Sequence, residues 1–75
     1  MQIKIRYFAW LREQRGTTEE WFALKQSCTV AALFQQVFNR VPEGVRFAIN
    51  AEYVEGDTLV EDGDEVAFLP PMGGG

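Results

Sequence analysis

The C-terminal segment carries the clearest chemical signal in this 75-residue chain, which ends in Pro70-Pro71-Met72-Gly73-Gly74-Gly75. Glycines bury little surface and lose much conformational entropy when ordered, so a glycine run is poor material for a core. Three residues without Cβ atoms can instead enter a channel barely wider than the backbone, reaching about 10 Å when extended. We therefore predict that residues 72–75 form a flexible tail whose reactive group is the Gly75 carboxylate.

That carboxylate needs activation before it can react. Adenylation by an ATP-using partner would convert Gly75 into a mixed anhydride, which a sulfur or amine nucleophile can attack. Gly73 and Gly74 would let the chain enter the partner's site without clashing, and the groups that stabilise developing charge would belong to that partner. We therefore expect a carrier that is a substrate of other enzymes. We expect no cofactor bound to it, because the ATP is used by the activating partner.

Other kinds of chemistry have little support in the sequence. The chain contains no histidine, which removes the commonest general base and the commonest metal ligand. Residues 61–65 carry four carboxylates but lack the spacing of a calcium loop, and a turn at Asp62-Gly63 explains them. Cys28 precedes a predicted helix, and an ordinary half-buried residue is the better interpretation than a cysteine-based carrier. We predict no metal site.

Length and charge narrow the possible partners. Seventy-five residues allow one domain, and no apolar stretch approaches the roughly 18 residues of a membrane span. The single cysteine and the alternating N-terminus favour a cytoplasmic location. Residues 1–42 carry six basic and three acidic side chains, whereas residues 43–75 carry Arg46 against eight acids. The acidic half should repel nucleic acid and favour a basic protein surface.

Hydrophobic periodicity predicts most of the elements. Alternation indicates strands at residues 2–8, 17–24, 45–49, 53–54 and 65–69, with a short helical turn at 9–14. An apolar stripe at helical spacing predicts a helix from Thr29 to about Arg40, and its members are Val30, Leu33, Phe34, Val37 and Phe38. Turns are expected at Gly56-Asp57 and Asp62-Gly63, where glycine makes positive φ inexpensive.

This order of elements predicts a two-layer α+β domain over residues 1–71, with one main helix on a mixed sheet of four to five strands. The arrangement suggests the β-grasp, in which the first and last strands lie parallel and adjacent. If Ile3, Ile5 and Tyr7 face the helix, then Phe8 and Leu69 face away from it. Tyr53 could extend them into an apolar patch at the base of the tail, as in a protein interface.

The chain resembles the MoaD-type sulfur carriers, the small subunits of molybdopterin synthase. The resemblance spans almost the whole chain, and its most specific part is the DGDEVAFLPP segment at residues 62–71 joined to the glycine tail. Further matching segments are Ile3 to Ala9, Leu11-Arg12-Glu13, Gly16-Thr17, Thr29 to Leu33 and Ile49-Asn50.

The resemblance implies a cycle of sulfur transfer. A MoeB-type, E1-like enzyme would adenylate Gly75, a sulfur donor would convert it to a thiocarboxylate, and the tail would enter a MoaE-type large subunit to sulfurate cyclic pyranopterin monophosphate. Gly74 and Gly75 match the functional terminal pair of the family. The family's partner contacts match Phe8, Tyr53 and Leu69, and they continue through Pro70, Pro71, Met72 and Gly73.

Three alternatives remain open at the level of sequence. A ThiS-type carrier for thiazole synthesis would share the fold, the tail and the thiocarboxylate. A ubiquitin-like protein modifier would instead end in an isopeptide bond from Gly75 to a lysine, giving conjugates that resist reducing agents. A plain binding module with an unreactive tail is the simplest alternative.

Overall fold

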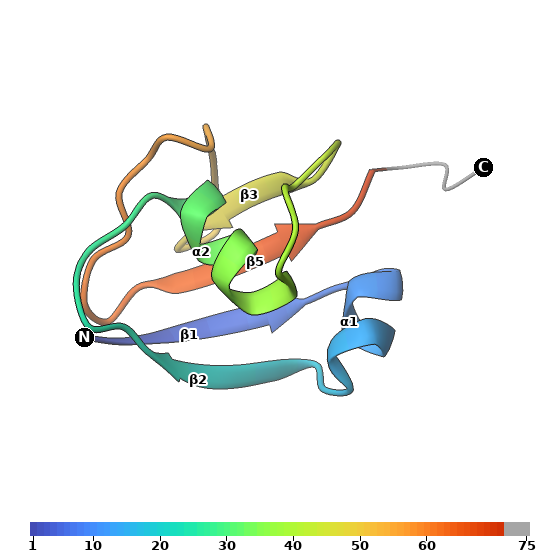
Figure 1. Cartoon of the computed structure of the whole chain (residues 1–75), viewed down its shortest axis with the longest axis horizontal. Coiled ribbons are helices and arrows are strands. Elements are labelled where there is room, and N and C mark those ends of the chain that lie inside the picture. The colour runs from blue at the N-terminus through green and yellow to red at the C-terminus, as the bar shows by residue number, and fades with distance from the viewer. Residues whose placement is uncertain (72–75) are drawn as a thin grey trace.

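The computed structural model describes residues 1–71, which form a five-stranded mixed sheet with the main helix packed on one face (Figure 1). The elements in chain order are β1 (Gln2–Tyr7), α1 (Ala9–Arg15), β2 (Glu19–Ala23), α2 (Val30–Phe38), β3 (Arg46–Ile49), β4 (Glu52–Val54) and β5 (Glu65–Leu69). The strand order is β2-β1-β5-β3-β4, with β1 and β5 parallel and the other pairs antiparallel. The predicted β-grasp with its central parallel pair is therefore confirmed. The predicted tail, residues 72–75, lies outside the described residues.

Two details of the sequence prediction were wrong. Helix α2 ends at Phe38 and not near Arg40, because Asn39 adopts the left-handed conformation (φ 58°) and its N–H bonds to the Gln35 carbonyl. Gly63 has the expected positive φ of 87°, but Gly56 does not. Glycine is favoured at position 56 for space, since a Cβ there would lie 3.3 Å from the Ala31 Cβ.

The core lies between α2 and the inner face of the sheet, where β1 and β5 contribute alternate residues. Its fully buried members from these three elements are Ile3, Ile5, Val30, Leu33, Phe34, Val66 and Phe68. The Phe34 and Phe68 rings meet edge to face at 5.1 Å, a favoured aromatic geometry. The Thr29 hydroxyl caps α2 by accepting from the Ala32 N–H at 3.1 Å. Within residues 1–71, neither helix has the length and apolar character needed to cross a membrane.

A polar cluster joins β1, β2 and α1 at the edge of this core. The Tyr7 hydroxyl donates to Glu20 Oε2 at 2.6 Å, and the Arg15 Nε donates to the same oxygen. Burial, reinforced by the bond to Glu20, raises the pKa of Tyr7. Burial also acts to raise the pKa of Glu20, but the hydrogen bonds from Arg15 and Tyr7 outweigh it and hold that pKa below its usual value.

The raised pKa of Tyr7 predicts a loss of stability in alkali. Above the ordinary tyrosine pKa of 10.0, the unfolded chain releases the phenolic proton while the folded chain keeps it, so the free energy of unfolding should fall as pH rises past 10. Tyr7→Phe should cost about 1 kcal/mol at pH 7 and flatten this alkaline decline. Urea unfolding between pH 8 and 11 measures both effects. An equally steep decline in the variant would contradict the assignment.

Candidate functional site

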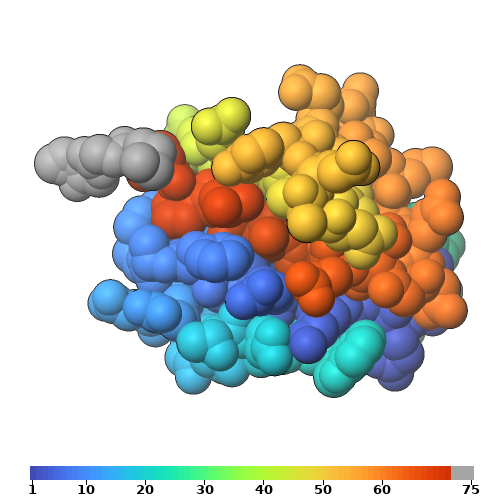
Figure 2. All heavy atoms as spheres, turned by 180° about the vertical axis from the view of Figure 1, so that it is seen from behind, coloured from blue at the N-terminus to red at the C-terminus, as the bar shows by residue number. Residues whose placement is uncertain are grey.

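An apolar patch lies on the outer face of the sheet, opposite to the face on which α2 packs. Figure 2 shows the molecule from this side. We call this apolar patch the outer-face patch and define it as Phe8, Ala48, Ala51, Tyr53, Ala67 and Leu69. These residues, with Arg6 and Glu65 at the rim, line a hollow of about 270 Å³. Tyr53 is 66% exposed and Phe8 37% exposed.

Strand register brings the patch together. Ala48 pairs with Ala67 of β5 on one side and with Tyr53 of β4 on the other, so all three project from the same face. Leu69 pairs with Arg46 of β3, and Phe8 follows β1 directly. Alternation had placed Phe8, Tyr53 and Leu69 outward, and the structure arranges them around one hollow. Their role in partner binding stays a prediction.

The patch includes a backbone conformation that alanine rarely adopts. Asn50 and Ala51 join β3 to β4 with φ values of 51° and 70°, as in the two-residue hairpin turns that favour Asn-Gly. The Asn50 side chain secures the turn, because its Nδ2 donates to Asp64 Oδ1 and its Oδ1 accepts from the Glu65 N–H, both at 3.0 Å. Ala51 therefore holds its methyl group in the patch at some cost in backbone strain.

Replacing that alanine tests the strain. Ala51→Gly should raise the free energy of unfolding by up to about 1 kcal/mol, since glycine adopts positive φ without a Cβ clash. Urea unfolding of the variant and of the parent chain measures the difference. If the variant is less stable than the parent, the packing of the Ala51 methyl group contributes more to the free energy of unfolding than the backbone strain takes away.

The C-terminal end of β5 leads directly from the patch to the tail. Pro70 is half-buried and Pro71 is exposed, and neither has an N–H with which to extend the sheet. A Cβ on Gly44 would lie 3.4 Å from Pro71 Cγ, so Pro71 packs against the loop between α2 and β3. The remaining predicted site residues, Met72, Gly73, Gly74 and Gly75, lie outside the described part of the chain.

Comparison with known proteins decides the family. The model of the ThiS family matches residues 5–75. This chain belongs to the ThiS family. Among curated members, the molybdopterin synthase sulfur carrier subunit of Chlamydomonas reinhardtii is 39% identical, with all of both chains covered. The human molybdopterin synthase sulfur carrier subunit is 34% identical over 99% of this chain and 94% of its own.

Solved structures agree on the fold of this ThiS-family chain. The small archaeal modifier protein 1 of Methanosarcina acetivorans superposes with a TM-score of 0.75 at 26% identity, covering 99% of this chain and 96% of its own. A Helicobacter pylori structure, titled as a complex of subunits 1 and 2 of molybdopterin-converting factor, matches over the full length of both chains with a TM-score of 0.63 and 20% identity. At 20% identity, the similarity to the Helicobacter pylori structure shows the fold alone.

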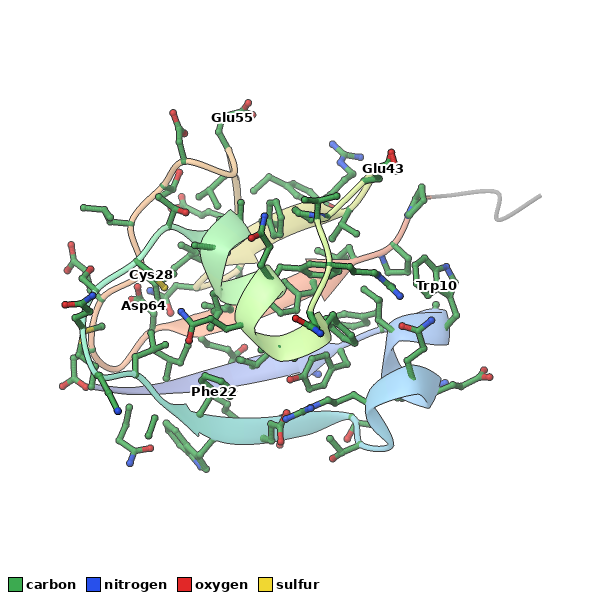
Figure 3. All side chains as sticks on the ribbon, in the orientation of Figure 1. Trp10, Phe22, Cys28, Glu43, Glu55 and Asp64 are labelled. Atoms are coloured by element: carbon green, nitrogen blue, oxygen red, sulfur yellow. The ribbon has the colours of Figure 1, made fainter. Side chains whose placement is uncertain are left out.

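The lone thiol of this ThiS-family chain is distant from the C-terminal end of β5. Cys28 lies beside the start of α2, at the end of the molecule opposite to the C-terminal end of β5 (Figures 1 and 3). Burial raises the pKa of Cys28, which disfavours the nucleophilic thiolate. Its Sγ accepts a hydrogen bond from Gln36 Nε2 at 3.7 Å. These features fit the half-buried residue that the sequence suggested.

The acidic segment acts as a turn in the part of the chain that the structure describes. Asp62 Oδ1 accepts from the Gln2 N–H at 2.7 Å, and Asp64 Oδ2 accepts from the Glu61 N–H at 2.8 Å. No group of three or more potential metal ligands forms among residues 1–71. The carboxylates of Asp62 and Asp64 therefore satisfy the backbone donors of Gln2, which begins β1, and of Glu61, which directly precedes the turn.

Sequence reasoning missed three contributors to the surface around the patch. Ala48 and Ala51 are too small to stand out in a hydrophobic pattern. Ala48 joins the patch through cross-strand pairing with Tyr53 and Ala67, and Ala51 joins it through the turn between β3 and β4. Arg46 was noted for its charge alone, yet it lies beside Leu69 with its guanidinium carbon 4.7 Å from the centre of the Tyr53 ring. The outward direction of the Arg46 side chain could have been predicted, because Arg46 alternates along β3 with Phe47, which faces the core.

Proposed function

We propose that this chain is the sulfur carrier subunit of molybdopterin synthase and that it carries sulfur as a thiocarboxylate on Gly75. The observation that carries this proposal is the similarity to two sulfur carrier subunits, 39% and 34% identical, which covers 100% and 99% of this chain. The fold supports it, because β5 leads from the outer-face patch straight to Pro70, Pro71 and the final residues.

The chemistry occurs in two stages on the same terminal carboxyl group. The Gly75 carboxylate attacks the α-phosphorus of ATP within a MoeB-type activating enzyme, releasing pyrophosphate and forming the acyl-adenylate. A sulfide-equivalent nucleophile then displaces AMP, leaving the thiocarboxylate. Because the chain lacks histidine, the proton transfers and charge stabilisation are left to the partners.

The outer-face patch serves as the docking surface for a MoaE-type large subunit, where the sulfur is delivered to cyclic pyranopterin monophosphate. The Helicobacter pylori protein with the same fold was solved together with its subunit 2, which supports a partner of this class. Phe8, Tyr53 and Leu69 are the anchors, since large apolar groups at the centre of an interface supply most of its binding energy. The cycle takes place in the cytoplasm.

Protein modification is the second candidate, favoured by one observation. A structural neighbour at 26% identity is named a small archaeal modifier protein. A modifier would join Gly75 to lysine side chains of other proteins, and these conjugates would survive reducing agent on a denaturing gel.

Intact-mass measurement tests the carrier function directly. The full chain is incubated with ATP, the cognate activating enzyme and a sulfide donor, and its mass should rise by the difference between one sulfur and one oxygen. Omitting ATP is the control and should leave the mass unchanged. A chain that keeps its original mass under complete conditions, while forming lysine conjugates in lysate, would favour the modifier.

A further inference from the structure

The outer face of the sheet carries three cations, and two of them have partners within the chain. Lys4 Nζ lies 3.4 Å from Glu19 Oε2, and Arg6 lies 3.8 Å from both Glu19 and Glu65. Arg46 differs, because it forms no ion pair with any residue in the range 1–71. It is also the only basic residue in the half of the chain that carries eight acids.

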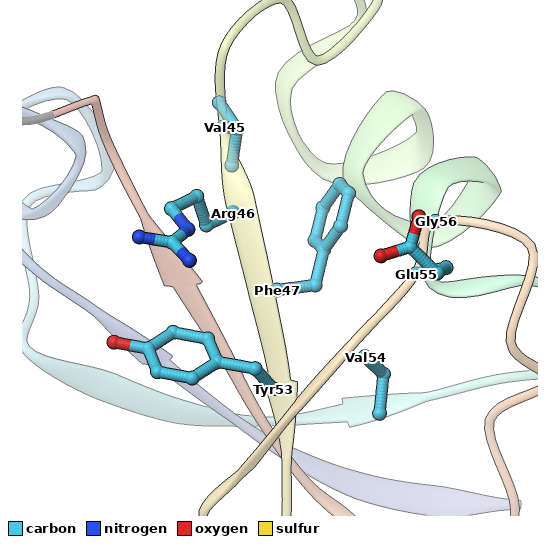
Figure 4. A pocket seen from close by; sticks show the side chains of 7 residues that line it. All are labelled: Val45, Arg46, Phe47, Tyr53, Val54, Glu55 and Gly56. Carbon is cyan, nitrogen blue, oxygen red and sulfur yellow. The ribbon is translucent and has the colours of Figure 1, made fainter.

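Arg46 is nevertheless held in a defined place. Its guanidinium carbon lies 4.7 Å from the centre of the Tyr53 ring, on the same face as Leu69, its cross-strand partner (Figure 4). Stacking on an aromatic ring leaves the N–H donors at the edge of the guanidinium plane available. The donors therefore lie at the border of the outer-face patch, next to the strand that leads to the tail.

The chain also leaves room for a partner beside this arginine. Strand β4 pairs with β3 only as far as Val54, after which Gly56 passes beneath α2 and its carbonyl accepts from the Ala31 N–H at 3.0 Å. This departure opens a hollow of about 240 Å³ along the edge of β3 (Figure 4). Its lining residues are Val45, Arg46, Phe47, Tyr53, Val54, Glu55 and Gly56. Tyr53 separates it from the hollow of the patch and lines both.

We propose that Arg46 binds a carboxylate of the large subunit that docks on the outer-face patch; this inference rests on the proposed function. A guanidinium accepts a carboxylate in a bidentate geometry, which fixes orientation as well as adding affinity. Arg46 is the only basic residue among residues 43–71, so this part of the chain offers an acidic side chain of the partner no other cation. Arg46 therefore sets the position of the partner relative to the tail.

The test measures binding of the purified large subunit by calorimetry at low and high salt. Arg46→Gln should weaken binding about tenfold or more and reduce its salt dependence, as expected for loss of a charge-assisted hydrogen bond. Arg46→Lys should restore part of the affinity, because it keeps the charge and loses the bidentate geometry. Lys25→Gln is the matched control, since Lys25 is exposed and forms no ion pair within residues 1–71.

Two results would overturn the inference while leaving the proposed function in place. Arg46→Gln could bind as tightly as the parent chain, which would show that no partner carboxylate is engaged. It could instead bind more tightly, which would show that Arg46 holds a group of its own chain, such as the terminal carboxylate, away from the partner. If the parent chain itself fails to bind the large subunit, the proposed function fails together with this inference. Urea unfolding of each variant verifies that the fold is unchanged.

Discussion

A chain that lacks Gly75 should transfer no sulfur, although it folds with the same stability as the full chain. The acyl-adenylate and the thiocarboxylate both form on the terminal carboxylate, so shortening the chain withdraws that group by about 3.5 Å from the partner's reacting atoms. Misplacement of a reacting group by about 1 Å can already lower a rate a hundredfold. Extension by one alanine beyond Gly75 should have an equally large effect, since it replaces the carboxylate at that position by a peptide bond.

The measurement combines intact mass after activation with a sulfur-transfer assay using the large subunit. Urea unfolding provides the control, because the hydrophobic core found within residues 1–71 ends at Phe68 and neither change should alter it. An extended chain trimmed back to Gly75 should regain transfer. Normal activity in the untrimmed extended chain would refute the assignment of Gly75 as the sulfur-bearing residue.

A carboxylate in the outer-face patch should disrupt docking. In Leu69→Glu the new group would lie beside Arg46 in the free chain, and binding would have to strip water from both charges while losing an apolar contact. We expect binding of the large subunit to weaken by at least a hundredfold, which corresponds to about 3 kcal/mol. Phe8→Glu should act similarly from the other side of the hollow.

Trp21→Glu is the matched control for these two variants. Trp21 is 64% exposed on the same face of the sheet, but it belongs to the edge strand β2 and lies outside the patch. Calorimetry of the three variants, with urea unfolding for each, separates docking from stability. Equal losses of affinity in all three would mean that the effect follows net charge and not the patch.

Much of the fold could be predicted because its signals are local. The alternation of Ile3, Ile5 and Tyr7 and the helical stripe from Val30 to Phe38 each record which side of an element is buried. The two errors had different causes. One arose because several residue types can adopt the backbone conformation that ends a helix, and the other because a contact with a residue elsewhere in the chain decided the role of a glycine. Asn39 ends α2 two residues early, and glycine is favoured at position 56 by the close approach to Ala31.

The candidate site likewise has features that local sequence signals predict and features that depend on contacts between distant residues. By itself, the sequence led to the prediction that the glycine end is the reactive group, and it placed Phe8, Tyr53 and Leu69 on the outward side of their strands. Only the tertiary structure decided that Ala48 and Ala51 complete one hollow with them, and that Arg46 lies beside Leu69 and over Tyr53. The physical reason is that side-chain direction follows from each strand's own period of two, whereas neighbours across strands depend on register and strand order, which residues far apart in the chain fix together.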